Sequence, residues 1–213
     1  MGKLVLKGNF VRSGVAGLSL LVLSGSIGCG GYSPPTVTGT TPGFNLDLSD
    51  AFTGLPNTYS AASGQAGAWN DCPVGTTSNL KDTAGNVTAV SITVTGFSGA
   101  FNTPTTDTGK LLGDYVQYNT VSATPVSISI TGLANGTYRV YYYYVSSMSG
   151  FTANGILMPS LTADGSASAR DSLGTVGFNW YYVDAFVTSG TLAITDSTPT
   201  SLEGISGLQI VPI

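Results

Sequence analysis

The sequence contains no histidine and a single glutamate, and only 8% of its 213 residues are charged. Without histidine, Ser-His-Asp and Cys-His catalysis and histidine-based metal sites are all excluded. A glycosidase needs two carboxylates that face one another across the sugar, and Glu203 together with scattered aspartates forms no paired motif. We therefore predict that the protein is not an enzyme, and we keep a secreted hydrolase or lyase as an alternative.

Basic residues are also scarce once the first 28 residues are set aside. Four cations, at Lys81, Lys110, Arg139 and Arg170, then stand against all 11 acidic residues of the chain. Binding to a phosphate backbone depends on clustered lysine and arginine side chains. We therefore predict that nucleic acid is not a partner.

The N-terminal 28 residues have the layout of a secretory signal, in which basic residues precede a short apolar run and then small residues. The apolar run, centred on 15–23, is too short for a transmembrane helix. The following Ser26-Ile27-Gly28-Cys29 resembles the lipobox of bacterial lipoproteins, although this family usually has Leu where Ser26 stands. We predict an exported protein of the cell envelope, held on the membrane by lipid on Cys29, or otherwise secreted.

The two cysteines allow two arrangements. If Cys29 carries lipid, Cys72 is left as a single thiol, buried as a small hydrophobe; if it does not, a Cys29–Cys72 disulfide is permitted in an oxidising compartment. Residues 29–43 are rich in Pro, Gly and Thr and are predicted to be a flexible tether. The predicted folded domain spans 44–213.

The chain beyond residue 43 is rich in short apolar runs, and the whole sequence contains 29 glycines. Gly, Asn, Pro, Ser and Thr clusters separate the runs, and no helix-period segment exceeds a turn or two. This pattern predicts an all-β protein with an antiparallel β-sandwich or barrel. The expected strands are 44–48, 58–62, 68–71, 87–97, 114–119, 126–130, 137–146, 156–161, 180–187, 192–195 and 205–212, and Ser98–Gly113 is expected to be a long, functional loop.

The tyrosine-rich segment Thr137–Ser146 is predicted to be the central strand. Side chains alternate along a strand, so its even-numbered residues are assigned to the core and its odd-numbered residues to the opposite face. The Gly132–Gly136 turn joins it to Val126–Ile130. We predict that these two strands form a hairpin.

Several segments in sequence order resemble the galactose-binding-domain-like superfamily of secreted bacterial modules. They are Gly67-Ala68-Trp69-Asn70, the Thr88–Phe97 strand, Leu112-Gly113-Asp114-Tyr115, the Val126–Tyr142 segment and Ile205–Pro212. The resemblance implies a jelly-roll-like β-sandwich and a noncatalytic module that often binds ligands through end loops and often carries a structural calcium near the first strand. Fold-level similarity does not fix the ligand.

Aromatic side chains are the main candidates for ligand binding, because sugars stack their C–H faces on aromatic rings. The candidates are Trp180 and Tyr181 at a strand start and Tyr141 and Tyr143 on the odd-numbered face. Burial in the core is the alternative for each, and Trp69 is assigned to the core.

Asn45, Asp47 and Asp50 cluster around the first strand and are the candidate calcium ligands, with solvated strand-end positions as the alternative. Asp114 and Asp184 are expected to be turn or surface residues. Together these features predict a noncatalytic surface lipoprotein that binds a polysaccharide or another extracellular polymer. A structural or adhesive module that engages other envelope proteins is the alternative.

Overall fold

The computed structural model describes residues 41–48, 51, 53–100, 104–118, 124–144, 147–148, 150–162, 173–196 and 204–213. The described residues all belong to one compact unit, Gly39–Ile213. The predicted signal peptide, Cys29 and Asp50 lie outside the described residues. Among the described residues, no helix has the length and apolar character needed to cross a membrane.

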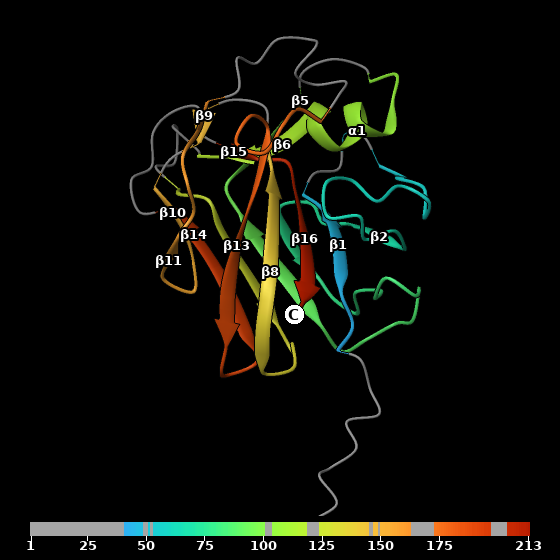
Figure 1. Ribbon diagram of the computed structural model, residues 1–213, viewed down its shortest axis with the longest axis vertical. Coiled ribbons are helices and arrows are strands. Elements are labelled where there is room, and N and C mark those ends of the chain that lie inside the picture. The colour runs from blue at the N-terminus through green and yellow to red at the C-terminus, as the bar shows by residue number, and fades with distance from the viewer. Residues whose placement is uncertain are drawn as a thin grey trace, which may run out of the picture. The chain divides into compact units, whose positions relative to one another are not determined.

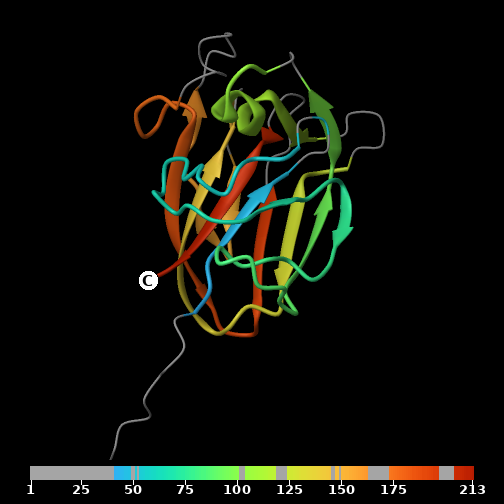
Figure 2. The same ribbon diagram turned by 90° about the vertical axis from the view of Figure 1, so that its right-hand side faces the viewer.

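Two β-sheets pack face to face (Figures 1 and 2). The first has the strand order β13 (Trp180–Val187), β8 (Gly136–Tyr143), β16 (Gly207–Pro212), β1 (Phe44–Asp47) and β2 (Trp69–Asp71). The second has the order β11 (Ile156–Leu157), β10 (Phe151–Ala153), β14 (Thr191–Asp196), β7 (Ser127–Thr131), β4 (Ser91–Thr95) and β3 (Gly75–Thr77). All pairings in both sheets are antiparallel except that of β1 with β2, and the predicted antiparallel β-sandwich is confirmed.

Smaller elements lie at one end of the sandwich (Figure 1). They are β5 (Phe97–Ala100), β6 (Asp114–Gln117) and β15 (Gly204–Ile205) in one small sheet, β9 (Ser147–Met148) with β12 (Leu161–Thr162), and the helix α1 (Asp107–Gly113). The segment predicted as a long loop, Ser98–Gly113, therefore contains most of β5 and all of α1. Thr106 caps α1 through its hydroxyl, which accepts from the Gly109 N–H at 2.9 Å, and Leu111 and Leu112 are buried beneath it.

The main core fills the space between the two sheets. Tyr138, Val140 and Tyr142 of β8 are buried in it, as predicted for the even-numbered positions, and so are Ile92 and Val94 of β4. Buried phenols need hydrogen-bond partners. The Tyr138 hydroxyl donates to Ala134 O at 2.9 Å and the Tyr142 hydroxyl to Pro159 O at 3.0 Å.

The predicted hairpin between Val126–Ile130 and the tyrosine strand is wrong. β7 pairs with β4 and β14 in the six-stranded sheet, whereas β8 pairs with β13 and β16 in the other. The connection Gly132–Gly136 crosses from one sheet to the other, with Gly132 at a φ of 84° and Leu133 buried between the layers. β13 and β14 also lie in opposite sheets, and this alternation of consecutive strands gives the sandwich its jelly-roll-like character.

Candidate functional site

The outer face of β8 and β13 carries the candidate site. The two strands are antiparallel, with Tyr141 opposite Tyr182 and Arg139 opposite Asp184. Because side chains alternate along a strand, these four residues and Trp180 share the face that points away from the main core. We call Tyr141, Trp180 and Tyr182 the aromatic strip.

The three rings of the aromatic strip are in contact. The ring centroids of Tyr141 and Trp180 lie 6.1 Å apart with an interplanar angle of 28°, and those of Tyr141 and Tyr182 lie 5.4 Å apart at 41°. These separations are within the range in which aromatic pairs stabilise one another. Tyr182 is exposed, and Tyr141 and Trp180 are half-buried. The strip therefore offers a compact aromatic surface to solvent.

An ion pair borders the aromatic strip. Arg139 donates from Nε to Asp184 Oδ1 at 2.8 Å and from one terminal nitrogen to Oδ2 at 3.0 Å, and its guanidinium carbon lies 4.5 Å from the centre of the Tyr182 ring. The hydrogen bonds from Arg139 lower the pKa of Asp184 and raise that of Arg139 itself. Both charges are therefore retained at neutral pH and offset one another, so the border of the strip has no net charge.

Local hydrogen bonds fix Trp180 in place. Its indole N–H donates to Gly174 O at 2.8 Å, and the Gly174 N–H donates to Asn179 Oδ1 at 3.0 Å. Asn179 is fully buried, and its carbonyl accepts from the Tyr144 N–H at 3.1 Å. The position of the indole is therefore set before any ligand arrives.

Two of the four predicted aromatic residues do not lie on this surface. Tyr143 is buried, because the segment 53–67 covers this end of the sheet; its hydroxyl donates to Gln209 Oε1 and accepts from the Ala62 N–H at 3.0 Å. Tyr181 alternates to the other side of β13 and packs against the main core, 6.3 Å from Tyr142 between ring centroids. The assignment of Tyr143 to an exposed strip is therefore corrected.

Tyr182 belongs to the site although it was not among the predicted ligand residues. Its place two residues after Trp180 puts both rings on one face of a strand. Its proximity to Tyr141 depends on the pairing of β13 with β8, which joins residues far apart in sequence. The alternation was visible in the sequence, and the pairing was not.

A second, smaller hydrophobic cluster covers the rest of this sheet face. It contains Leu55, Leu111, Leu112 and Tyr143, with Trp69 packed against them. The Trp69 indole donates to Tyr59 O at 2.9 Å and its ring stacks on Tyr59 at 5.7 Å. Trp69 is thus a packing residue, as predicted.

Asn45 of the first strand, one of the three predicted calcium ligands, belongs to a buried polar network. Asn45 Oδ1 accepts from Gln65 Nε2 and Gln209 Nε2, both at 2.9 Å, and its Nδ2 donates to Gln65 O at 3.2 Å. The Asn45 side chain is therefore fully engaged within the protein.

Asp47, two residues after Asn45, differs from it in hydrogen bonding. It is fully buried, and neither of its carboxylate oxygens has a hydrogen-bond partner among the described residues. Burial raises its pKa, and the nearby carboxylates of Asp114 and Asp71 raise it further. Asp114, expected at a turn or on the surface, is also fully buried. No group of three or more His, Cys, Asp or Glu residues in the described part of the chain is arranged to hold a metal ion.

Cys72 is a free, buried thiol in the described structure. Its Sγ donates to Asn70 O at 3.4 Å, and burial raises its pKa. Because Cys29 lies outside the described residues, both predicted arrangements of the cysteines stay predictions.

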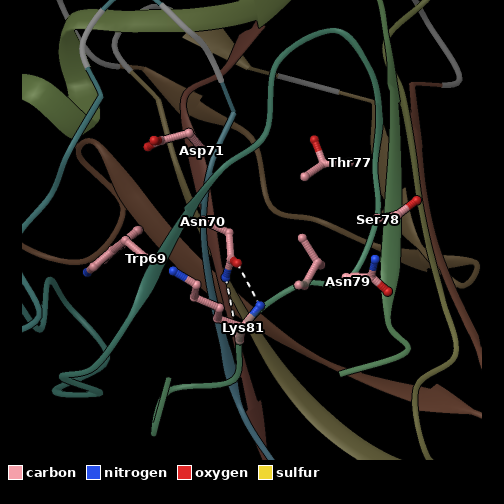
Figure 3. A pocket seen from close by; sticks show the side chains of 8 residues that line it. Trp69, Asn70, Asp71, Thr77, Ser78, Asn79 and Lys81 are labelled. Carbon is pink, nitrogen blue, oxygen red and sulfur yellow. Dashed lines mark hydrogen bonds between the residues drawn. The ribbon is translucent and has the colours of Figure 1, made fainter. Parts of the chain in front are cut away.

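A polar groove of about 220 Å³ lies beside β2 and is lined by Trp69, Asn70, Asp71, Thr77–Leu80 and Lys81 (Figure 3). Asn70 crosses its floor, donating to Lys81 O and accepting from the Lys81 N–H, both at 2.8 Å (Figure 3). The Asn70 amide that would recognise a ligand is thus used to join β2 to the segment at Lys81, and the aromatic strip is the better candidate site.

No protein family matches the chain, and no curated protein matches it significantly. Solved structures similar to it include the protein YXIM of Bacillus subtilis, with 14% identity over 80% of this chain and 40% of that one and a TM-score of 0.46. A β-glucuronidase 2 calcium-binding mutant of Bacteroides uniformis has 15% identity over 80% of this chain and 18% of that one, with a TM-score of 0.45. A CBM35 module of Paenibacillus barcinonensis has 20% identity over 57% of this chain and 93% of that one, with a TM-score of 0.35.

The chain spans less than half the length of the first two of these proteins. With TM-scores below 0.5 for all three, the candidate site is assigned on its own geometry.

Proposed function

We propose that the domain binds carbohydrate without catalysis, through the aromatic strip on the outer face of β8 and β13. The observation that carries this proposal is the contact of Tyr141, Trp180 and Tyr182 on one solvent-facing surface. Aromatic rings with polar edges suit sugars, which present apolar C–H faces ringed by hydroxyls.

The border of the strip indicates which glycans fit. The opposite charges of Arg139 and Asp184 largely neutralise each other. The remaining N–H donors of Arg139 and acceptor sites of Asp184 are available to the hydroxyls of a sugar. The rest of the domain is acidic, so it repels anionic polymers at long range. A neutral polysaccharide is therefore the proposed ligand class.

The purified protein is titrated with a panel of neutral and acidic soluble polysaccharides, and binding is monitored by the change in tryptophan fluorescence. Saturable quenching by a neutral glycan, with a weaker response to acidic ones, is the expected result. No response to any glycan, together with protein partners that co-purify from the envelope, would instead favour a structural or adhesive module.

We also propose a structural calcium beside β1, held by Asp47 and Asp114. Within the described part of the chain, the buried carboxylate of Asp47 has no hydrogen-bond partner, and such a group is costly to bury unless it is paired, protonated or bound to a cation. Calcium takes about six to eight oxygen ligands, so backbone carbonyls and water would complete the set. The ion would tie the end of β1 to the start of β6.

Export and anchoring are proposed from the sequence of residues 1–29. A signal peptide followed by lipid on Cys29 would hold the domain at the cell envelope through the tether. The free state of Cys72 is compatible with this arrangement. Mass spectrometry of the mature N-terminus tests the proposed lipid anchor. A diacylglyceryl-modified Cys29 is expected, and an unmodified terminus at any other residue contradicts the anchor.

A further inference from the structure

β13 is an eight-residue strand at the margin of the five-stranded sheet. It pairs with β8 on one side, and no strand in the described part of the chain pairs with its other side. Figure 1 shows β13 at this margin, next to β11 of the other sheet. Natural proteins usually protect long, apolar edge strands, because such strands template pairing with another chain.

Hydrogen bonds at both ends of β13 show which backbone groups face away from β8. The Trp180 carbonyl accepts from the Gly177 N–H at 2.9 Å. The Phe186 carbonyl accepts from Asn154 Nδ2 at 2.8 Å. Both carbonyls therefore point to the open side of the strand.

The centre of β13 is left open on that side. Backbone direction alternates with a period of two, so Tyr182 and Asp184 direct their N–H and C=O groups the same way as Trp180 and Phe186. No hydrogen bond from the described residues reaches these four groups at Tyr182 and Asp184. Each end of the edge is closed within the chain, and its middle presents two donors and two acceptors.

The surroundings of this edge are apolar. Tyr182 and Phe186 are exposed on β13, and Ile156 and Leu157 are exposed on the adjacent β11. Asn154, in the turn between β10 and β11, holds the two margins together through its bonds to the backbone of β13 and β14. Four of the nine large hydrophobic residues exposed in the described structure thus gather along one margin of the sandwich.

We propose that a second copy of this chain pairs with β13 in antiparallel register centred on Val183. In this register Tyr182 lies opposite Asp184 of the second copy, and each open N–H and C=O group of the two residues gains one partner in the other copy, because the two-fold axis repeats the pair. The register centred on Asp184 would place two aspartates directly opposite, which is destabilising.

Charge and shape favour a second copy over an unrelated strand. With Val183 at the centre, each Asp184 is flanked by its own Arg139 and by the Tyr182 ring of the other copy, so like charges stay apart. The strand is complementary to itself in this register. The exposed Leu157 and Phe186 of both copies would be brought to the same interface.

The pairing would join the outer faces of two five-stranded sheets into one continuous surface. Two aromatic strips would then lie side by side, and a polymer that engages both gains affinity without any new contact. The dimer itself rests on the open edge and does not depend on the glycan-binding proposal.

The test is sedimentation equilibrium of the purified protein and of two variants at one position. Tyr182→Pro removes an N–H that β8 does not use, a substitution that edge strands tolerate. Tyr182→Ala removes the ring and keeps the N–H. We expect a dimer for the wild type and a monomer for Tyr182→Pro. Tyr182→Ala should still dimerise, with a dissociation constant raised by about tenfold or less.

A wild type that remains monomeric at millimolar concentration, or a Tyr182→Pro variant that dimerises as tightly as the wild type, overturns the proposal. If Tyr182→Pro fails to fold, hydrogen exchange of the wild type replaces it. The amides of Tyr182 and Asp184 should be protected at high protein concentration and exchange rapidly on dilution, whereas those of Tyr181 and Val183 stay protected through β8. Equal, concentration-independent exchange of Tyr182 and Asp184 contradicts the pairing.

Discussion

The ring centroids of Tyr141 and Tyr182 lie 5.4 Å apart across the β8–β13 pair, on the face that points away from the main core. Arg139 lies against the same Tyr182 ring and is held there by Asp184. This group of side chains combines apolar area with hydrogen-bonding edges on a regular sheet, and it accounts for the proposed binding function.

The hydrogen bond between Tyr143 and Gln209 should contribute measurably to stability. In Tyr143→Phe the buried Gln209 Oε1 loses a donor and the Ala62 N–H loses its acceptor. We expect the free energy of unfolding to fall by about 1–3 kcal/mol in urea denaturation. Tyr182→Phe, which removes a hydroxyl from an exposed ring, is the control and should change it by less than about 0.5 kcal/mol. Equal losses of unfolding free energy in Tyr143→Phe and Tyr182→Phe would argue against a stabilising role for the Tyr143–Gln209 hydrogen bond.

Most of the fold, but less of the site, was predictable from sequence. Alternation of apolar and polar residues identified β4 and β7. The core positions Tyr138, Val140 and Tyr142 were predictable because residues two apart on a strand share one face. The burial of Tyr143 was not predictable, because the segment that covers it lies some 80 residues earlier in the chain.

The partners of β8 and the helix α1 were missed for related reasons. A short turn favours a hairpin locally, and only the packing of two layers shows that Gly132–Gly136 crosses between sheets. α1 has seven residues, including Gly109 and Gly113, so its sequence carries little helical periodicity. It is stabilised by the burial of Leu111 and Leu112 instead.

Calcium should stabilise the domain through Asp47. Thermal unfolding is expected at a higher temperature in calcium than in EDTA, because the ion compensates a buried carboxylate to which no described residue donates a hydrogen bond. In Asp47→Asn this difference should vanish. Asp71→Asn, at an exposed position nearby, is the control and should retain it. A calcium effect that survives in Asp47→Asn would place the ion elsewhere.

The Arg139–Asp184 ion pair should add a small amount to the free energy of unfolding, and this contribution should disappear in acid. The pKa of Asp184 is lowered in the folded state, so the contribution is fully present above the ordinary aspartate pKa of 3.8 and is lost as the pH falls through the lowered value. Both side chains are about a third or more exposed, and solvent screening keeps the effect small. The difference in unfolding free energy between wild type and Asp184→Asn should therefore shrink below pH 3.8. A difference that grows in acid would contradict this assignment.

Cys72 should be inert in the folded protein. Its thiol is fully buried and its pKa is raised by burial, so the reactive thiolate is absent at neutral pH. A thiol reagent is expected to label Cys72 only after denaturation, as shown by mass spectrometry of the peptide that contains it. Rapid labelling of the native protein would show that this region opens.

Calorimetric titration of Tyr182→Ala with the neutral polysaccharide that binds the wild type tests the central claim most directly. Phe97→Ala removes a comparably exposed ring from β5, away from the strip, and is the matched control. We expect Tyr182→Ala to weaken binding by roughly tenfold to a hundredfold, about 1.4–2.8 kcal/mol, while Phe97→Ala binds like the wild type. Wild-type affinity in Tyr182→Ala, with its fold intact by circular dichroism, would contradict glycan binding at the aromatic strip.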